Sequence, residues 1–307
     1  MGGFHAMGTE VTVLAPAASA IEEAALTRAI AAIFAELEGT FSRFRRTSLL
    51  SRLNRANQAL SLPPEVLALL DRAGAYFERT GGLFNPAVGA SLRDAGYDRS
   101  FSPGALDRPT SPGAATGSVV SLAEALRIDH ERGTATVRAG VEIDLGGIVK
   151  GLAVDRAAAL LPANGAVDAG GDVYLKGEAE PGAGWLVDVE DPFDASRVAM
   201  TLRVRDAGVA TSAPNRRQWR CAGHTLHHLI DPRTGAPARS DLAQMTVVAR
   251  TAELADVLAK AAFVAGSDRA TSLLADGGAR GGVMIHRSGV VETIGDVEVV
   301  DEPASLG

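Results

Sequence analysis

The stretch that most constrains the fold of this chain is Ile143–Arg156, in which an apolar segment leads into a glycine pair, a lysine and a second apolar segment. Gly146 and Gly147 let the backbone turn tightly and approach a ligand closely. Apolar residues then recur at helical spacing, which predicts that a strand ends here and a helix begins. Lys150 falls in the first turn of that helix, where free backbone N–H groups favour an anion. A tight turn with solvated charges is equally compatible with this motif alone.

Capping signals and helical periodicity predict three further helices. Ser19 followed by Glu22 is a capping-box pattern, and the helix after it is expected to stop at Gly39. Pro64 is a favourable first-turn residue for a second helix. Thr251 can cap a third helix near the end of the chain.

Short alternating segments bounded by turn residues predict strands, most of them in hairpins. The three strands between Val173 and Val204 form an expected meander. Hairpins outnumber crossover connections, which predicts an α+β fold with mainly antiparallel sheets and packed helices. The expected strands are Glu10–Leu14, Leu126–Asp129, Thr134–Arg138, Val173–Lys176, Trp185–Val189, Val198–Val204, Met245–Ala249, Val283–His286 and Val290–Ile294.

Length and composition agree with a globular protein, for which we expect one domain over residues 1–307. A chain of 307 residues can bury a sizeable core, and 46% apolar with 22% charged residues is neither disordered nor membrane-like. Residues 102–118 are rich in Pro, Gly, Ser and Ala, so they are expected to form a surface loop.

Charge and hydropathy restrict the partners of the chain. The formal charge of −7 argues against a nucleic-acid surface, which needs clustered Lys and Arg. No apolar run approaches the roughly 20 residues of a spanning helix, so no membrane span is expected. The first residues lack the basic and apolar regions of a signal peptide, which predicts a cytoplasmic protein and leaves an exported mature form open. The single cysteine, Cys221, excludes an internal disulfide.

Further short motifs occur in a fixed order along nearly the whole chain. Each is weak by itself, but the ordered set is specific. The set resembles the FAD:protein FMN transferases, the ApbE-like flavin transferases, and it implies their fold. The motifs lie on both sides of residues 102–118, which supports a loop within one domain. The matching segments are Met7–Thr9, Phe41–Phe44, Ser48–Asn54, Gly82–Pro86, Ile143–Gly151, Asp168–Asp172, Thr211–Ser212, His228–Gly235 and Ala255–Asp256.

The resemblance implies transfer of FMN from FAD to a threonine hydroxyl of an acceptor flavoprotein domain, with release of AMP. In such a reaction Lys150 and a magnesium ion hold the pyrophosphate, while His228 takes the proton of the attacking hydroxyl. Two alternatives stay open. Attack by water would make the chain an FAD pyrophosphatase that yields FMN and AMP, and loss of the metal site would leave a non-catalytic FAD-binding protein.

The resemblance also assigns FAD contacts residue by residue. Phe44 stands where the family usually has tyrosine, which keeps ring stacking but loses a phenol hydrogen bond. Asn85 replaces the aspartate of a Gly-x-Phe-Asp-Pro pattern, which drops one charge. Taken alone, Asp144 can instead cap the helix, and the hydroxyls of Thr211 and Ser212 can bind either a phosphate or their own loop. The assigned FAD contacts are Met7, Phe44, Asn85, Asp144, Lys150, Thr211, Ser212 and His228.

His228 is the candidate general base, because an imidazole titrates near neutral pH and can accept the hydroxyl proton. The turn Asp231–Gly235 would fix where the ring points, although His228 can equally serve only to order that turn. Cys221, His224, His227 and His228 form the metal-like cluster of the sequence. Alternation along a strand places His227 on the other face, which argues against a local zinc site.

The magnesium ligands implied by the resemblance are the Gly147 carbonyl and Asp256, with Asp256 also in the catalytic group. The family pattern is Ala-Asp-x-x-x-Thr, but Lys260 stands at the threonine position. A protonated lysine has donors and no acceptor, so it cannot ligate a metal. Three outcomes are open: water completes the metal shell, the ammonium of Lys260 replaces the charge of the metal, or the protein is a degenerate flavin binder.

Overall fold

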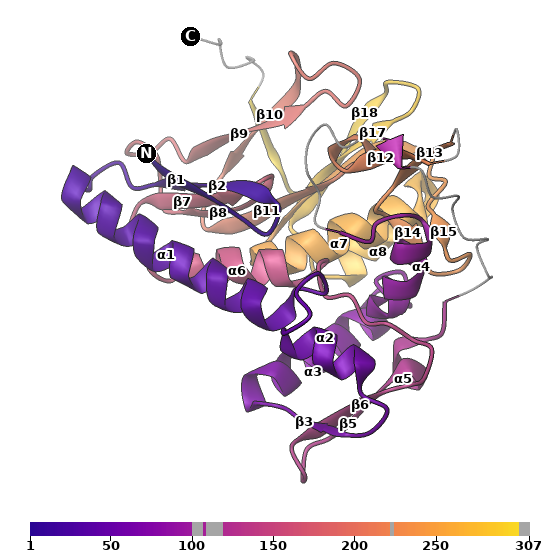
Figure 1. Cartoon of the computed structure of the whole chain (residues 1–307). Coiled ribbons are helices and arrows are strands. Elements are labelled where there is room, and N and C mark those ends of the chain that lie inside the picture. Colours follow the sequence, from indigo (N-terminus) through magenta and orange to yellow (C-terminus); the bar gives the residue numbers. More distant parts are fainter. Residues whose placement is uncertain (100–106, 109–118, 222–223, 301–307) are drawn as a thin grey trace. The chain divides into compact units, whose positions relative to one another are not determined.

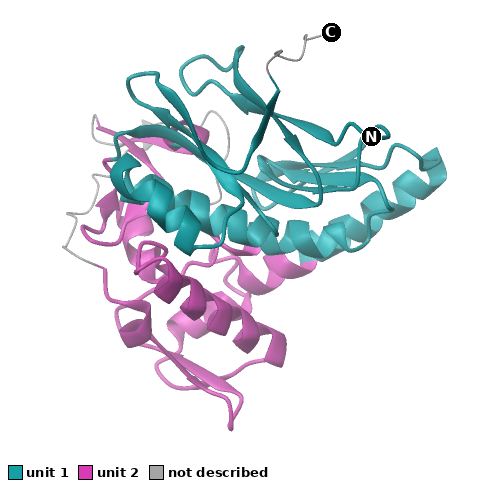
Figure 2. Cartoon of the chain, turned by 180° about the vertical axis from the view of Figure 1, so that it is seen from behind, with its two compact units in different colours: residues 1–35, 150–213, 240–307 teal, residues 36–149, 214–239 magenta. Residues whose placement is uncertain are grey.

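The computed structural model describes residues 1–99, 107–108, 119–221 and 224–300. The chain divides into two compact units, each built from segments that are distant in sequence (Figure 2). Unit 1 comprises residues 1–35, 150–213 and 240–307, and unit 2 comprises residues 36–149 and 214–239. One domain over residues 1–307 stays a prediction. The loop expected at 102–118 lies outside the described residues, except for the short strand β4 (Asp107–Arg108).

Unit 1 is built on an eight-stranded antiparallel sheet in the order β1-β2-β7-β8-β11-β16-β17-β18 (Figure 1). Strands β8 and β11 are neighbours in this sheet, with Asp172 opposite Ala210. Side chains of directly opposed residues share one face of a sheet. The strands are β1 (Gly2–Ala6), β2 (Thr9–Leu14), β7 (Gly165–Ala169), β8 (Asp172–Lys176), β11 (Ala207–Ser212), β16 (Leu242–Ala249), β17 (Gly281–His286) and β18 (Val291–Gly295).

The two faces of this sheet have different covers. Strands β9 (Trp185–Glu190), β10 (Val198–Val204) and β19 (Glu298–Val300) form a second antiparallel sheet, whose apolar side chains pack against Val209 of β11. Helix α7 (Ala252–Ala265) lies against β8, β11 and β16, and α8 (Ser267–Asp276) follows it. A Cβ at Gly208 would come within 2.2 Å of the backbone nitrogen of Ala252. Gly208 therefore faces α7, whereas Val209 faces the second sheet. Asp172 lies opposite Ala210, which shares the face of Gly208, so α7 covers the face that carries Asp172.

Unit 2 consists of short helices and small sheets. Its sheets are β3-β6-β5, β13-β12-β4 and β14-β15. Trp219 of β12 is buried in its core together with Leu92 and Ile230, and the indole N–H donates to the Ala95 carbonyl at 2.7 Å. The remaining elements are α2 (Leu49–Arg55), β3 (Leu60–Ser61), α3 (Pro64–Arg79), η1 (Pro86–Val88), α4 (Gly89–Asp94), α5 (Leu122–Ala125), β5 (Leu126–Asp129), β6 (Thr134–Val137), η2 (Pro214–Arg216), β12 (Gln218–Cys221), β13 (His224–His227), β14 (Ile230–Asp231) and β15 (Ala236–Pro237).

Two helices, α1 (Ala20–Phe41) and α6 (Val149–Ala158), each contain a boundary between the units. The capping box before α1 is confirmed, since the Ser19 hydroxyl and backbone N–H donate to Glu22 at 2.7 and 2.8 Å. The expected stop at Gly39 is wrong. A Cβ at Gly39 would meet no atom within 4 Å, and the helix continues to Phe41.

The α+β fold with mainly antiparallel sheets is confirmed. The helices from Pro64 and after Thr251 are confirmed, as are the hairpins β5–β6 and β17–β18. The meander between Val173 and Val204 is confirmed only for its last two strands, because β9 pairs with β10 while β8 pairs with β7 and β11. The strand expected before Gly146 is also wrong. That extended segment bonds to the side-chain amide of Asn54 instead, at 2.8 and 2.9 Å from Ile143.

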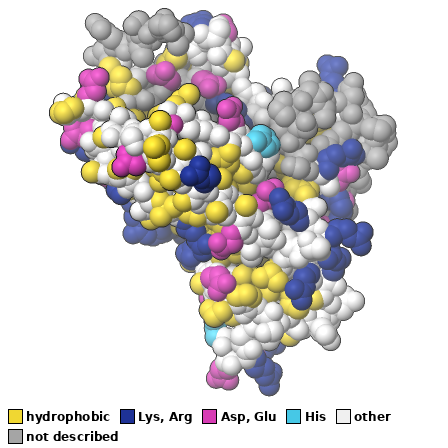
Figure 3. Space-filling model, turned by 60° about the vertical axis from the view of Figure 1, so that its left-hand side comes forward, with side chains coloured by type: hydrophobic (Ala, Val, Ile, Leu, Met, Phe, Trp, Pro, Cys, Tyr) yellow, Lys and Arg dark blue, Asp and Glu magenta, His cyan; other side chains and the backbone are white. Residues whose placement is uncertain are grey.

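Acidic and basic side chains lie interspersed with apolar ones on the face drawn in Figure 3.

None of the helices in the described ranges is both long and apolar enough to cross a bilayer.

Candidate functional site

Four charged side chains of unit 1 form one group, which we call the carboxylate–ammonium cluster: Lys150, Asp172, Asp256 and Lys260. Lys150 lies in the first turn of α6, as the sequence predicts, and its ammonium pairs with Asp172 at the start of β8. The same ammonium donates to the Ala169 carbonyl at 3.0 Å. On α7, the ammonium of Lys260 donates to Oδ1 of Asp256, one helical turn away.

The two carboxylates of this cluster are buried and the two ammonium groups are closer to solvent. The Asp172 and Asp256 side chains are each 3% exposed, against 14% for Lys150 and 21% for Lys260. Burial and the negative charge of Asp172 raise the pKa of Asp256 to about 6, while the ammonium groups of Lys260 and Lys150 oppose that rise. The Oδ2 atom of Asp256 accepts no hydrogen bond within the described part of the chain. A ligand would therefore meet the lysines before the carboxylates.

Helices α6 and α7 are fixed to one another by polar and steric contacts. The Asp155 carboxylate of α6 accepts the backbone N–H groups of Ala252 and Glu253, the first residues of α7, at 2.8 and 2.9 Å. The Thr251 hydroxyl accepts a further N–H of this first turn at 3.1 Å, which confirms it as the N-cap. At Gly151 a Cβ would lie 2.5 Å from the Glu253 Cα. This close approach sets Lys150 of α6 relative to the charged residues of α7.

Thr211 and Ser212 end strand β11, and strand alternation sends them to opposite faces of the sheet. Ser212 is buried and shares the face of Ala210, which lies opposite Asp172. Thr211 lies on the other face, where its hydroxyl shares a 2.9 Å hydrogen bond with that of Thr246. The structure therefore does not bring the two hydroxyls together, and it places Ser212 on the face of the carboxylate–ammonium cluster.

Met7 occupies the two-residue turn between β1 and β2. Its φ is +51°, and that of Gly8 is +72°. The flanking pair Ala6 and Thr9 closes the hairpin. Positive φ at both central residues is the geometry of a type I′ turn, in which Asn and Gly are the preferred residues. A methionine in this conformation is strained and therefore points to a role beyond the turn.

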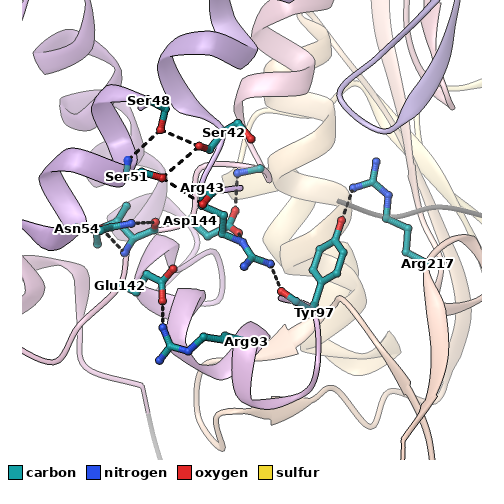
Figure 4. A network of polar contacts seen from close by, with 12 residues as sticks. Ser42, Arg43, Ser48, Ser51, Asn54, Arg93, Tyr97, Glu142, Asp144 and Arg217 are labelled. Atoms are coloured by element: carbon teal, nitrogen blue, oxygen red, sulfur yellow. Dashed lines mark hydrogen bonds and ion pairs between the residues drawn. The ribbon is translucent and has the colours of Figure 1, made fainter. Parts of the chain in front are cut away.

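Unit 2 contains an arginine–aromatic cluster formed by Arg43, Phe44, Tyr97, Asp144 and Trp219. Figure 4 shows three of them, Arg43, Tyr97 and Asp144. The Arg43 guanidinium, whose side chain is 5% exposed, donates to the Asp144 carboxylate and to the Tyr97 carbonyl. It lies 4.2 Å from the centre of the Phe44 ring and 5.0 Å from that of Tyr97. Tyr97 stacks on Trp219 with ring centres 5.4 Å apart. One buried cation thus joins a carboxylate to an aromatic wall.

The residues around the glycine pair are largely engaged in local hydrogen bonds. Oδ1 of Asp144 accepts the Gly146 N–H at 2.6 Å, so Asp144 orders the turn that contains Gly147.

Asn85 is buried, and its amide accepts from the Ala87 N–H and donates to the Val120 carbonyl, both at 3.0 Å. An aspartate could not make the second bond, which explains the asparagine here.

His228 lies at the bend after β13, and its Nδ1 is 3.3 Å from the Arg217 carbonyl. Because a carbonyl only accepts, this contact favours the tautomer with the proton on Nδ1 and the lone pair on Nε2. The neighbouring His227 is buried, with Nε2 3.2 Å from the Ala238 carbonyl and Nδ1 accepting the Leu229 N–H at 3.3 Å. Both ring nitrogens of His227 are thus engaged within the fold, which disfavours His227 as a base.

The turn after His228 is tight, as the sequence predicts. The Asp231 carboxylate accepts from the backbone N–H and the guanidinium of Arg233, at 2.8 to 3.2 Å. The Gly235 N–H returns to the Asp231 carbonyl at 2.8 Å, and Gly235 has a φ of +67°. Exposure along β13 does not alternate residue by residue: His224 and Thr225 are exposed and His227 is buried, while His228 lies beyond the strand.

Comparison with known proteins decides the family. A sequence model of the ApbE family matches residues 7–283. The chain belongs to the ApbE family. It is 30% identical to the FAD:protein FMN transferase of Treponema pallidum over 274 residues, which cover 80% of this chain and 76% of that protein.

Solved structures of the ApbE family agree with this placement. The ApbE protein of Thermotoga maritima superposes with a TM-score of 0.83 at 29% identity, covering 95% of this chain and 96% of that one. The flavin transferase ApbE of Vibrio cholerae gives a TM-score of 0.76 at 25% identity and covers 96% of both chains.

Sequence reasoning missed three residues that organise these two clusters: Arg43, Tyr97 and Asp172. Arg43 and Asp172 lie within segments that match the family, but neither had been assigned a role. Their partners, Asp144 and Lys150, are distant in sequence, so only the fold brings them together. The one local signal in the sequence is the position of Asp172, which directly follows a glycine pair and begins an alternating segment.

Proposed function

We propose that this chain transfers FMN from FAD to a threonine hydroxyl of an acceptor protein and releases AMP. The observation that carries the proposal is its similarity to the Treponema pallidum FAD:protein FMN transferase, 30% identical over most of both chains. The carboxylate–ammonium cluster agrees with this function, because ammonium groups near a solvent-accessible surface suit the diphosphate of FAD.

The proposed reaction is an in-line displacement at the FMN phosphorus. A bond forms between the acceptor oxygen and phosphorus, while the bond from that phosphorus to the bridging oxygen breaks and AMP departs with the bridging oxygen. The acceptor proton passes to Nε2 of His228. Lys150 offsets the negative charge of the diphosphate.

The proposed FAD contacts are Met7, Phe44, Asn85, Asp144, Lys150, Thr211, Ser212 and His228. Lys150 and Phe44 offer the chemistry expected of such contacts, namely a point charge for phosphate and an apolar ring. For Thr211, the hydroxyl contact with Thr246 favours a structural role.

Magnesium is the metal that the family resemblance implies, with the Gly147 carbonyl and Asp256 as ligands. Magnesium requires near-octahedral oxygen coordination. In the parts of the chain that the structure describes, no three His, Cys, Asp or Glu side chains are grouped to hold a metal ion. Oδ1 of Asp256 accepts from Lys260, which has no lone pair for a metal when protonated. The residues present therefore do not fit magnesium.

The test of the proposed function is to incubate the purified chain with FAD and a candidate acceptor domain. Mass spectrometry of the acceptor detects added FMN, and chromatography detects AMP. Modification of a threonine together with AMP release supports the transferase. AMP without modified protein indicates the pyrophosphatase, and bound FAD without AMP indicates a flavin-binding protein.

Substitution of His228 tests its proposed role as the base. We expect His228→Ala to lower FMN transfer by about 10²-fold or more and to weaken FAD binding much less than that. The exposed His224 on neighbouring strand β13 offers a matched control, and His224→Ala is expected to leave transfer unchanged. Wild-type turnover in His228→Ala would remove His228 from the mechanism.

A further inference from the structure

Lysine is rare in this chain, and its few positions are informative. Only Lys150, Lys176 and Lys260 occur among 30 basic residues, so the chain otherwise uses arginine. Two of the three lysines contact the buried carboxylates of the carboxylate–ammonium cluster. A lysine ammonium is a compact point charge, whereas a guanidinium is a broad planar fork. The lysines therefore occur where a small cation fits between buried oxygens.

The cluster balances its own charge without a metal. Asp172 and Asp256 together carry two negative charges when ionised, and the ammonium groups of Lys150 and Lys260 carry two positive ones. Buried carboxylates persist only when they pair with a cation or coordinate a metal. With Lys260 present the balance is complete, so a divalent ion brought here would be repelled by two neighbouring ammonium groups.

Lys260 is also placed to contact a ligand. It lies on α7, whose first turn is held by Thr251 and by the Asp155 carboxylate. Its ammonium has three donors, and the hydrogen bond described for it goes to Oδ1 of Asp256. Its side chain is 21% exposed, so the remaining donors can reach phosphate oxygens.

We propose that the ammonium of Lys260 takes the place of a divalent cation in this chain, which binds the diphosphate of FAD without metal. The inference rests on the proposed function, since it concerns how the same FAD is held. Lys260 keeps Asp256 paired and donates to the diphosphate, while Lys150 does the same beside Asp172. Magnesium is then neither required for FAD binding nor retained by the protein.

The experiment compares wild type, Lys260→Thr and Lys260→Met. FAD affinity is measured by flavin fluorescence in excess EDTA and in millimolar magnesium chloride, and manganese binding is measured by electron paramagnetic resonance without FAD. For wild type we expect the two FAD affinities to agree within about twofold and no bound manganese. Lys260→Met should bind FAD about tenfold or more weakly in both buffers.

Lys260→Thr is expected to behave differently from both. It removes one positive charge and places a hydroxyl one turn from Asp256, which creates an oxygen site with a net negative charge. The FAD affinity of this variant should be lower than that of wild type in EDTA and should recover in magnesium chloride. The variant should also bind manganese. Riboflavin, which lacks phosphate, should bind all three proteins equally.

Lys176→Met is the matched control, because the Lys176 ammonium donates to the Leu161 carbonyl at 2.7 Å. It should retain wild-type FAD affinity in both buffers. Three results would each overturn the inference. Wild type could require magnesium to bind FAD, wild type could bind manganese stoichiometrically, or Lys260→Met could keep the wild-type FAD affinity. The wild-type measurements need no variant, so poor folding of a variant leaves the test intact. If wild type binds FAD in neither buffer, the proposed function fails as well. This result distinguishes failure of the proposed function from failure of the inference about Lys260.

Discussion

The strained backbone at Met7 is the clearest residue-scale sign of a functional constraint. A non-glycine residue at φ +51° costs roughly 1 kcal/mol, and an asparagine would relieve most of that cost. We therefore expect Met7→Asn to raise the free energy of unfolding by about 0.5–1 kcal/mol and to weaken FAD binding. Chemical denaturation and flavin fluorescence measure the two effects separately.

The matched control lies next to it. Gly8 has a φ of +72°, so Gly8→Ala should lower stability by a similar amount without removing a side chain. If Met7→Asn gains stability and keeps full FAD affinity, Met7 has no part in binding and the strain has another cause.

Single residues also mark the limit of sequence reasoning about the site. Lys150 was placed correctly because a local pattern sets its position in the first helical turn. Asp172 and Arg43 were missed because their partners are remote in sequence. Asn85 looked like a lost charge, but the Val120 carbonyl that requires its amide donor can be seen only in the fold.

At the scale of elements, the packing of α6 on α7 decides where Lys150 lies. Gly151→Ala gains up to about 1 kcal/mol in helix propensity, but its Cβ would lie 2.5 Å from the Glu253 Cα. Such overpacking against backbone costs about 1–3 kcal/mol, so we expect net destabilisation. Gly39→Ala in α1, with no atom within 4 Å of its Cβ, should instead stabilise by about 0.5–1 kcal/mol. Urea denaturation of both variants checks the opposite signs, and destabilisation by Gly39→Ala would contradict the steric argument.

Helix α8 is capped by a residue outside its own turn, and this gives a pH-dependent prediction. Its N-cap, Gly266, has no capping side chain, and the Asp241 carboxylate accepts the backbone N–H of Ser267 at 3.1 Å and its hydroxyl. Burial alone would raise the pKa of Asp241, but these hydrogen bonds lower it below its ordinary value. The carboxylate therefore stabilises the fold above the unfolded pKa of about 3.9, and this contribution disappears as pH falls through the folded pKa.

Asp241→Asn removes the charge while keeping an oxygen acceptor. We expect it to lower the unfolding free energy by about 0.3–1 kcal/mol at about pH 7, and by less at about pH 3. Thermal denaturation at the two pH values measures the difference. Equal losses at both would show that the carboxylate charge contributes nothing.

Elements with local signals were predictable and those defined by pairing were not. The Ser19 box, Pro64 and the Thr251 cap fix three helix starts through neighbours in sequence. The pairing of β8 with β11 skips two intervening strands, so proximity in sequence predicted the wrong neighbour. The segment before Gly146 has an apolar strand pattern, but the Asn54 amide satisfies its backbone in place of a strand.

At the scale of the whole molecule, the prediction of one domain over residues 1–307 implies that the two compact units unfold together. A ligand that binds only the native chain should then stabilise the whole transition rather than one part of it.

This coupling can be measured by calorimetry in the presence of EDTA. At a free FAD concentration of 100 times its Kd, binding to the native state should raise the unfolding free energy by about 2.7 kcal/mol. For a protein of this size, that corresponds to a rise in Tm of roughly 4 °C, in a single transition. Riboflavin should give a smaller rise, because it lacks the diphosphate that meets Lys150 and Lys260. Two separate transitions, of which FAD moves only one, would contradict the single domain and would assign FAD to the residues of the unit that shifts.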